Sequence, residues 1–274
     1  MEKPKLAATV DPLIWVGPDD PAFEYSGLVH YAHVPKEANL ARPAPLVVMI
    51  HGWGGHEGVM WIFKQTIPPG VAVIAPRAPF ALEQAEGFTW FYEQGGQRLE
   101  PTPESLERGL EKLQQFLASL PELYPVDPDH LILMGFSQGA AMITALLLTH
   151  PQLKAGDGVE PLGGEPAKAS TPYARDATVD SITDRTLGVV LLAGAQLNRP
   201  QFRPAADSLA GLPVFIAHGS EDAIIPLAMA QQVRDIYLEA GAEVTYREYP
   251  TGHKVNSQGM KDLTAWLASH QYQS

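Results

Sequence analysis

The segment Gly135-Phe136-Ser137-Gln138-Gly139 places a serine between two glycines in the pattern G-x-S-x-G. An apolar run at 131–134 precedes it, and a helix-forming segment at 138–149 begins within it. In a strand-turn-helix unit of this kind the serine hydroxyl is exposed at the turn, and the glycines let the strand and the helix converge without clashes. The pattern and its context predict that Ser137 is a nucleophile.

A serine hydroxyl needs a base near neutral pH, normally a histidine that a carboxylate orients. After this type of turn the chain order is serine, acid, histidine. Of the nine histidines, only His253 and His270 satisfy both that order and the expected context, since His150 ends the nucleophile helix and His218 precedes every well-placed acid. His270 lies on the last expected helix, where a solvated surface residue is the simpler interpretation. We therefore expect His253, in a loop after an expected strand at 244–249, to be the base, with activity that rises through about pH 6–7.

The acid is expected on a loop that follows a strand, between Ser137 and His253. Asp222 meets this condition, because it follows a buried apolar run at 213–217 and active sites collect at the carboxyl ends of strands in open α/β sheets. The structural alternative is that Asp222 only caps the turn that follows it. The competing acids are Glu221, its direct neighbour, and the less well placed Asp207 and Asp235.

Acyl transfer also needs hydrogen-bond donors for the oxyanion. The main-chain N–H of Gln138 is the first expected donor, since it follows the nucleophile at the start of a helix. The second is expected from the Gly-rich segment 51–55, directly after an apolar run at 46–50, with the N–H of Trp53 as the best candidate. The alternative, a phosphate-binding loop, lacks both the Lys-Ser/Thr pair and the G-x-G-x-x-G pattern.

The elements that position these residues alternate along the chain. Continuous apolar runs indicate strands buried on both faces, as in a parallel sheet, and amphipathic or apolar segments between them indicate helices. The expected strands are 46–50, 71–74, 131–134, 187–192 and 213–217, with an antiparallel edge strand within 25–34. The expected helices are 56–66, 105–120, 138–149, 226–240 and 256–269.

This alternation predicts an α/β fold with a mostly parallel central sheet and helices on both faces. Nothing in the pattern indicates a second core, so we expect one domain over residues 1–274. Residues 152–185 have no sustained period and read as an insertion, which is either a functional lid or a flexible segment.

Composition excludes several other classes of protein. The net charge of −12 over 274 residues disfavours nucleic acid as a partner. The absence of cysteine removes disulfides and thiolate metal sites and fits a cytoplasmic location. No window is apolar enough to span a bilayer, and the N-terminus lacks the apolar core of a signal peptide. Residues 56–60 begin like H-E-x-x-H but end in methionine, so we expect no metal.

An aromatic cluster flanks a Gly-containing loop at 80–92. We expect it to line an acyl pocket, since aromatic side chains line most small-molecule sites, although an ordinary core position is the alternative. The expected pocket residues are Phe80, Trp90 and Phe91, with Phe88 and Tyr92 in the same cluster.

In this order the motifs resemble the phospholipase/carboxylesterase family of α/β-hydrolases, which includes acyl-protein thioesterases. The matching segments are His51-Gly52-Trp53-Gly54-Gly55, Ala75-Pro76-Arg77-Ala78-Pro79, Gly87-Phe88-Thr89-Trp90-Phe91, Gly135-Phe136-Ser137-Gln138-Gly139-Ala140, residues 218–226 and Gly252-His253-Lys254-Val255. Two features depart from the family pattern: Trp53-Gly54-Gly55, where members often have an aliphatic residue and Gly-Asp, and the 152–185 insertion.

The resemblance implies a cofactor-free serine hydrolase in which Ser137, Asp222 and His253 form a triad that cleaves small-molecule acyl esters. A thioesterase, or a peptidase or acyltransferase with the same triad, is the nearest alternative. A binding module that keeps the fold without catalysis is the alternative from another class.

Overall fold

The computed structural model describes residues 13–96, 100–149, 186–197 and 204–270. The expected insertion at 152–185 lies outside these residues. The elements of the N-terminal half are β1 Ile14–Val16, α1 Pro21–Ser26, β2 His30–His33, β3 Ala44–Ile50, the 3-10 helix η1 Val59–Thr66, β4 Ala72–Pro76, β5 Phe80–Ala81, β6 Phe88–Thr89 and the 3-10 turn η2 Gln94–Gly96. Those that follow are α2 Pro103–Leu123, β7 Val126–Phe136, α3 Gln138–Thr149, β8 Thr186–Leu192, β9 Pro213–Gly219, α5 Leu227–Glu239, β10 Glu243–Tyr249 and α6 Ser257–Ser269.

An eight-stranded sheet in the order β1-β2-β4-β3-β7-β8-β9-β10 forms the centre of the fold. The six strands from β4 to β10 are parallel to one another, and β2 is antiparallel to both β1 and β4. Four of the five apolar runs identified in the sequence lie within parallel strands, and the fifth, 71–74, begins one residue before β4. Their central residues are almost fully buried because helices cover both faces of the sheet.

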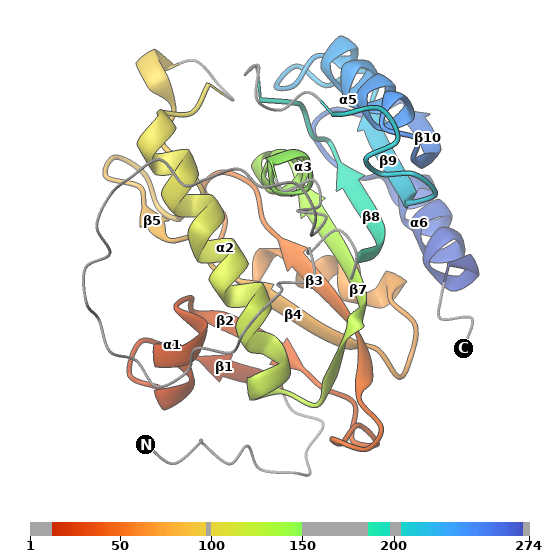
Figure 1. Cartoon of the computed structure of the whole chain (residues 1–274). Coiled ribbons are helices and arrows are strands. Elements are labelled where there is room, and N and C mark those ends of the chain that lie inside the picture. The colour runs from red at the N-terminus through yellow and green to blue at the C-terminus, as the bar shows by residue number, and fades with distance from the viewer. Residues whose placement is uncertain (1–12, 97–99, 150–185, 198–203, 271–274) are drawn as a thin grey trace, which may run out of the picture.

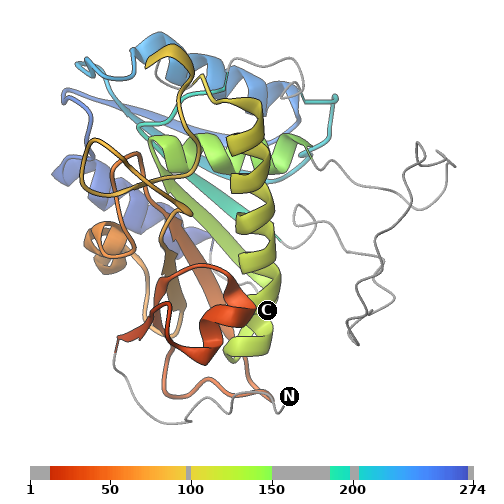
Figure 2. The same cartoon turned by 90° about the vertical axis from the view of Figure 1, so that its left-hand side faces the viewer.

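The helices divide between the two faces of this sheet (Figure 1). One face packs against α2, α3 and α5, and its core includes the leucines at the three- and four-residue steps of α2. The opposite face packs against η1 and α6. The view along the sheet in Figure 2 shows α2 lying along one side of it. The expected fold class, an α/β layer structure with a mostly parallel sheet, is confirmed.

The region expected to be an edge strand within 25–34 has a different structure. Tyr25 lies in helix α1, and only His30–His33 forms a strand, which is antiparallel as expected but second from the edge because β1 pairs outside it. Local capping explains the helix. Asp20 accepts a hydrogen bond from the N–H of Ala22, proline occupies the first turn, and Gly27 closes the helix at φ 68°. These signals outweigh the loose alternation of apolar residues.

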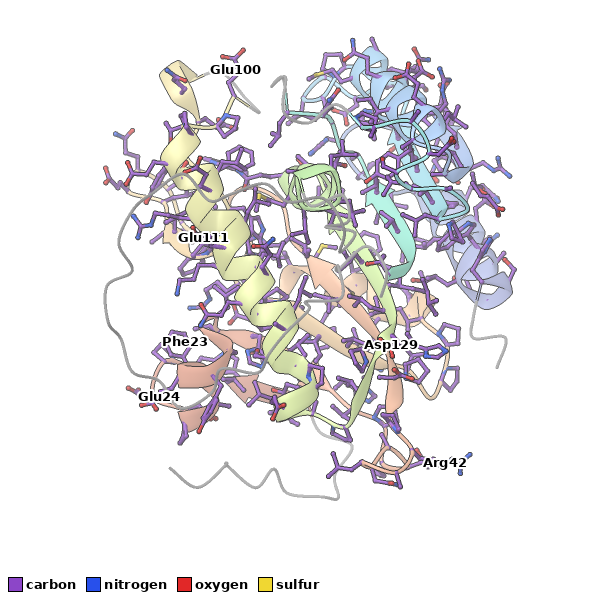
Figure 3. The ribbon with its side chains drawn as sticks, viewed as in Figure 1. Phe23, Glu24, Arg42, Glu100, Glu111 and Asp129 are labelled. Carbon is purple, nitrogen blue, oxygen red and sulfur yellow. The ribbon has the colours of Figure 1, made fainter. Side chains whose placement is uncertain are left out.

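Five of the six residues labelled in Figure 3 are charged and exposed: Glu24, Arg42, Glu100, Glu111 and Asp129. The sixth, Phe23, is half-buried. Among the helices of the described residues, none combines the length and the apolar character needed to cross a membrane.

Candidate active site

The turn between β7 and α3 exposes Ser137 at the carboxyl end of a central strand. Ser137 has φ 53°, a left-handed conformation that is unusual for a residue other than glycine. Its N–H donates to the carbonyl of Leu192 on β8, which fixes the turn to the neighbouring strand. A Cβ atom on Gly139 would lie 2.1 Å from the carbonyl oxygen of Ile50, so only glycine permits this approach of α3 to β3.

Ser137, His253 and Asp222 form one chain of hydrogen bonds. The His253 Nδ1–H donates to Asp222 Oδ2 at 2.7 Å, which leaves Nε2 as the acceptor for the Ser137 hydroxyl at 3.0 Å. The ring of His253 contacts Phe136 edge-to-face, with centroids 5.1 Å apart. The three residues lie on loops after β7, β9 and β10, which end at the same edge of the sheet.

The carboxylate of Asp222 is buried and fully hydrogen-bonded. Its Oδ1 accepts from the main-chain N–H groups of Ile224 and Ile225 at 2.8 and 2.9 Å. Burial opposes ionisation, but the hydrogen bonds from Ile225, His253 and Ile224 outweigh it and hold the pKa of Asp222 below its usual value. Asp222 therefore remains an anion that orients His253.

A second buried histidine, His218, lies behind the same carboxylate. Its Nε2–H donates to the carbonyl of Ile225 at 2.9 Å and lies 3.5 Å from Asp222 Oδ2. His218 thus ties the last residues of β9 to the turn that carries the acid. Chain order removes it from consideration as a base, and only the structure reveals this supporting position.

The Gly-rich loop at 51–55 runs directly against the nucleophile. A Cβ on Gly52 would stand 3.2 Å from Ser137 Cβ. His51 holds the loop from inside: Nδ1–H donates to the carbonyl of Gly52 at 2.7 Å, and Nε2 accepts from the N–H of Ala78 at 3.0 Å. Burial lowers the pKa of His51 to about 4, so the ring stays neutral and keeps both hydrogen bonds.

The side chain of Gln138 links the nucleophile turn to the aromatic segment. Its Oε1 accepts from the N–H of Trp90 at 2.9 Å, and its Nε2 donates to Thr89 Oγ1 at 2.9 Å. The indole N–H of Trp90 in turn donates to the carbonyl of His51. Within the described part of the chain, the main-chain N–H groups of Trp53 and Gln138 make no hydrogen bond to protein. Both expected oxyanion donors are thus available.

An ion pair between buried Glu57 and the partly buried Arg77 anchors the segment that follows this loop. The guanidinium of Arg77 donates two hydrogen bonds of 2.6 Å to Glu57, whose carboxylate also accepts from the indole of Trp15 at 3.2 Å. Arg77 also lies over the ring of Phe88, 4.6 Å from its centroid. Burial opposes ionisation of Glu57, but the Arg77 hydrogen bonds, with smaller contributions from its own main-chain N–H and from Trp15, lower its pKa to about 2.

A cavity of about 570 Å³ opens beside Ser137 and His253. Trp53, on one side, is half exposed at 49% of its surface. Most of the remaining wall is apolar and comes from η1, from the end of β7, from the acid loop, and from α6 and the segment that leads into it: Val59, Met60, Ile62, Phe63, Phe136, Ile224, Val255 and Met260. An apolar wall beside a nucleophile suits an acyl chain or another apolar substituent.

The three aromatic residues expected to line the pocket do not line this cavity. Trp90 and Phe91 are fully buried in the core, and Phe80 packs against Tyr92 and Arg108. The sequence indicated an aromatic cluster but not its direction. The main-chain N–H of Trp90 donates to Gln138, and its indole N–H donates to the carbonyl of His51. These two hydrogen bonds hold Trp90 in the core.

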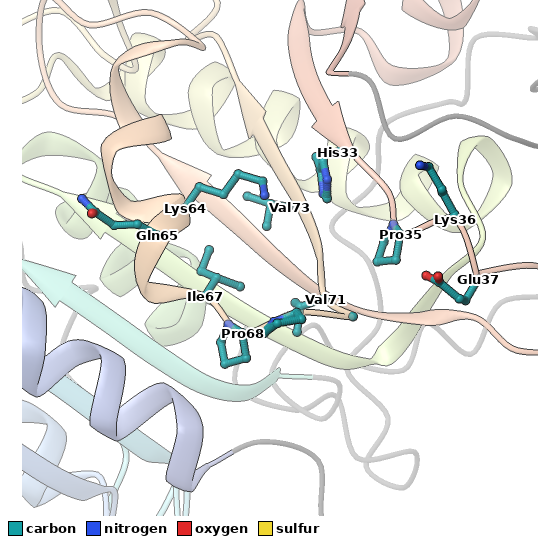
Figure 4. Close-up of a pocket in the computed structure, with 12 residues that line it drawn as sticks. His33, Pro35, Lys36, Glu37, Lys64, Gln65, Ile67, Pro68, Val71 and Val73 are labelled. Carbon is teal, nitrogen blue, oxygen red and sulfur yellow. The ribbon is translucent and has the colours of Figure 1, made fainter.

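A second cavity of about 440 Å³ lies on the far side of η1, near the end of β2 and the start of β4 (Figure 4). His33, Lys64 and Val73 are among its lining residues, and Gln65 lines both cavities. Neither Ser137 nor His253 reaches it. Over the described residues, no group of three or more His, Asp or Glu side chains is arranged to hold a metal ion.

The fold and the site define an α/β-hydrolase. Comparison with solved structures agrees. The Bacillus cereus carboxylesterase superposes with a TM-score of 0.66 at 20% identity, over 91% of this chain and 99% of that one. YahD, determined with malic acid, gives a TM-score of 0.67 at 18% identity, over 88% and 98%. At these identities the likeness concerns the fold.

Residues 64–261 match the serine hydrolase (FSH1) family, so the chain belongs to that family. The matched region contains Ser137, Asp222 and His253. Among curated proteins, acyl-protein thioesterase 1 of Kluyveromyces lactis is 24% identical over 246 residues, which cover 84% of this chain and 94% of that protein. The resemblance to the phospholipase/carboxylesterase family of α/β-hydrolases is confirmed.

Proposed function

We propose that this protein hydrolyses carboxylic esters through an acyl-enzyme formed on Ser137. The observation that carries the proposal is the continuous hydrogen-bonded chain from Asp222 through His253 to the Ser137 hydroxyl, with contacts of 2.7 and 3.0 Å. A serine, a histidine and an ionised carboxylate in that order are the components of base-assisted nucleophilic attack. Membership of a serine hydrolase family supports the same chemistry.

The proposed reaction has two steps. The Ser137 oxygen attacks the acyl carbon while His253 Nε2 takes the hydroxyl proton, and the main-chain N–H groups of Trp53 and Gln138 donate to the oxyanion. Protonated His253 then gives that proton to the departing alkoxide, which leaves as the alcohol. Water, deprotonated by His253, attacks the acyl-enzyme and releases the acid. Asp222 keeps Nδ1–H directed towards itself throughout.

The thioester is the second candidate substrate, because a curated relative that covers most of this chain is an acyl-protein thioesterase. Oxygen and sulfur leaving groups use the same nucleophile, base and oxyanion donors, so the triad does not distinguish them. A peptidase is a weaker candidate, since an amide needs more help for a poorer leaving group. We expect no metal or other cofactor in any of these reactions.

The test is a comparison of three butyryl substrates that differ only in the scissile atom: an oxygen ester, a thioester and an anilide. The proposal expects kcat/KM to be highest for the oxygen ester. A thioester preferred by more than about tenfold, beyond what one modest interaction gives, would reassign the chain as a thioesterase. A protein that turns over none of them and resists fluorophosphonate labelling would be a binding module. The cytoplasmic location stays a prediction.

A further inference from the structure

Among the described residues that line the cavity beside Ser137, one carries a permanent charge, the exposed Lys254. Lys254 is the only lysine or arginine among them, and no aspartate or glutamate accompanies it. The rest of the wall is apolar, apart from Gln65, the glycines and the catalytic pair. A lone cation beside an apolar wall adds nothing to the binding of a purely apolar substrate. Its presence therefore indicates a substrate that carries a negative charge.

Lys254 directly follows the proposed base in the sequence and lines the same cavity as Ser137 and His253. The Nε2 of His253 faces the Ser137 hydroxyl and delivers the proton to the leaving oxygen. The N–H of Lys254 donates to the carbonyl of Gly252 at 2.8 Å, so the main chain at this position is held in a tight turn. A leaving group must come within hydrogen-bonding distance of His253 to take up its proton, and Lys254 is the next residue on the same loop.

The ammonium group has no carboxylate partner among the described residues. Glu221 lies on the adjoining acid loop, where its N–H donates to the carbonyl of Thr251, and it does not line the cavity. The chain as a whole carries a net charge of −12, which repels anions. Salt screens that repulsion beyond about 8 Å, so a cation beside the cavity dominates the local field.

We propose that Lys254 selects substrates whose leaving group carries a carboxylate a few bonds from the scissile oxygen. The inference rests on the proposed function, because it names the leaving group of the same reaction. It assigns the apolar wall formed by η1 and α6 to the acyl part and Lys254 to the alcohol part. The cation attracts the anionic substrate and, after the acyl-enzyme forms, the carboxylate leaves with the alcohol.

The test uses two pairs of esters in which a carboxylate is replaced by a carboxamide of the same shape. In the first pair, 3-(butyryloxy)benzoate and 3-(butyryloxy)benzamide, the charge is in the leaving group. In the second, the phenyl monoesters of glutaric and glutaramic acids, it is in the acyl group. The ratio of kcat/KM between carboxylate and carboxamide cancels any general effect of a substitution on catalysis.

Three variants probe the lysine, and one controls for net charge. We expect Lys254→Gln to lower the leaving-group ratio about three- to fivefold and Lys254→Glu to lower it about tenfold, as for an exposed ion pair. Lys254→Arg should restore most of it. The matched control is Lys112→Glu, which changes net charge equally but lies on exposed α2, on the opposite face of the sheet. It should leave the ratio within about twofold.

Ionic strength distinguishes an electrostatic role of Lys254 from a purely structural one, because only the electrostatic effect on the leaving-group ratio depends on salt. Raising salt from about 0.02 to 0.5 M should shrink the effect of Lys254→Gln, because screening weakens the ion pair. A leaving-group ratio that stays unchanged in Lys254→Glu would overturn the proposal. This includes the case in which kcat/KM falls equally for the carboxylate and the carboxamide ester. A change of the ratio in the glutarate pair alone would also overturn it, because Lys254 would then recognise a carboxylate in the acyl group. These outcomes require turnover of the neutral esters, so they are distinct from failure of the hydrolase proposal itself.

Discussion

Replacing Glu57 with glutamine removes the buried anion that anchors the segment after the oxyanion loop. The pKa of Glu57 falls from an ordinary 4.5 to about 2 in the folded protein. Since each pKa unit corresponds to about 1.4 kcal/mol, the ionised form stabilises the fold by about 3 kcal/mol. The side chain is only 5% exposed, so solvent screens little of this. We expect Glu57→Gln to lower the free energy of unfolding at pH 7 by about that amount.

The sign of the pH dependence follows from the lowered pKa. The stabilisation is complete above the pKa of the unfolded chain and is lost as pH falls through the folded pKa. The difference between wild type and Glu57→Gln should therefore shrink from about 3 kcal/mol at pH 7 to about half that at pH 3. Urea unfolding followed by tryptophan fluorescence measures it, and a double-mutant cycle with Arg77→Met isolates the pair. A difference below about 1 kcal/mol at pH 7, or one equal at both pH values, would refute this account of the anchor.

Three further changes test other parts of the structure. Asp222→Asn should lower kcat for a p-nitrophenyl ester by about 10³- to 10⁴-fold with an unchanged circular dichroism spectrum, because the base loses its orientation; a loss below tenfold would contradict that role. Gly139→Ala should lower the free energy of unfolding by more than about 3 kcal/mol, because its Cβ would meet the Ile50 carbonyl. The control Gly70→Ala, which has open space around it but φ +84°, should lower it by about 1–2 kcal/mol. Equal falls in Tm for the two variants would be inconsistent with the close approach at Gly139. The pKa of His51 lies below that of an unfolded histidine, so protons bind preferentially to the unfolded chain and the free energy of unfolding falls from about pH 6.5 towards 4. Between pH 7 and 4.5, His51→Gln should lose about 2 kcal/mol less of this free energy than wild type. Parallel curves of unfolding free energy against pH would show that His51 does not contribute.

The sheet and its helices could be predicted because their signals are local. Each buried parallel strand is a continuous apolar run, and α2 repeats its leucines at helical spacing. Strand β1 could not be predicted, because three residues carry too little pattern. Helix α1 departs from the expected strand because capping by Asp20 and Gly27 outweighs a loose alternation of apolar residues.

In the candidate site too, the features with local sequence signals could be predicted and the long-range contacts could not. Chain order and strand ends were sufficient to place Ser137, Asp222 and His253 on neighbouring loops, where the structure brings them into hydrogen-bonding contact. The supporting contacts join residues far apart in sequence, such as Gln138 with Trp90 and Glu57 with Arg77. Nothing local signals such pairings. For the same reason the direction of the aromatic cluster could not be read from the sequence.

The measurement that tests the central claim most directly is covalent labelling of the intact protein with a fluorophosphonate, followed by mass spectrometry of its peptides. The account predicts one adduct, on Ser137, that forms in parallel with the loss of p-nitrophenyl butyrate turnover. Ser137→Ala should take up no label and keep less than about 1% of the activity, because removal of the nucleophile of a triad costs several orders of magnitude. An adduct on another serine, or a Ser137→Ala protein that retains its activity, would contradict it.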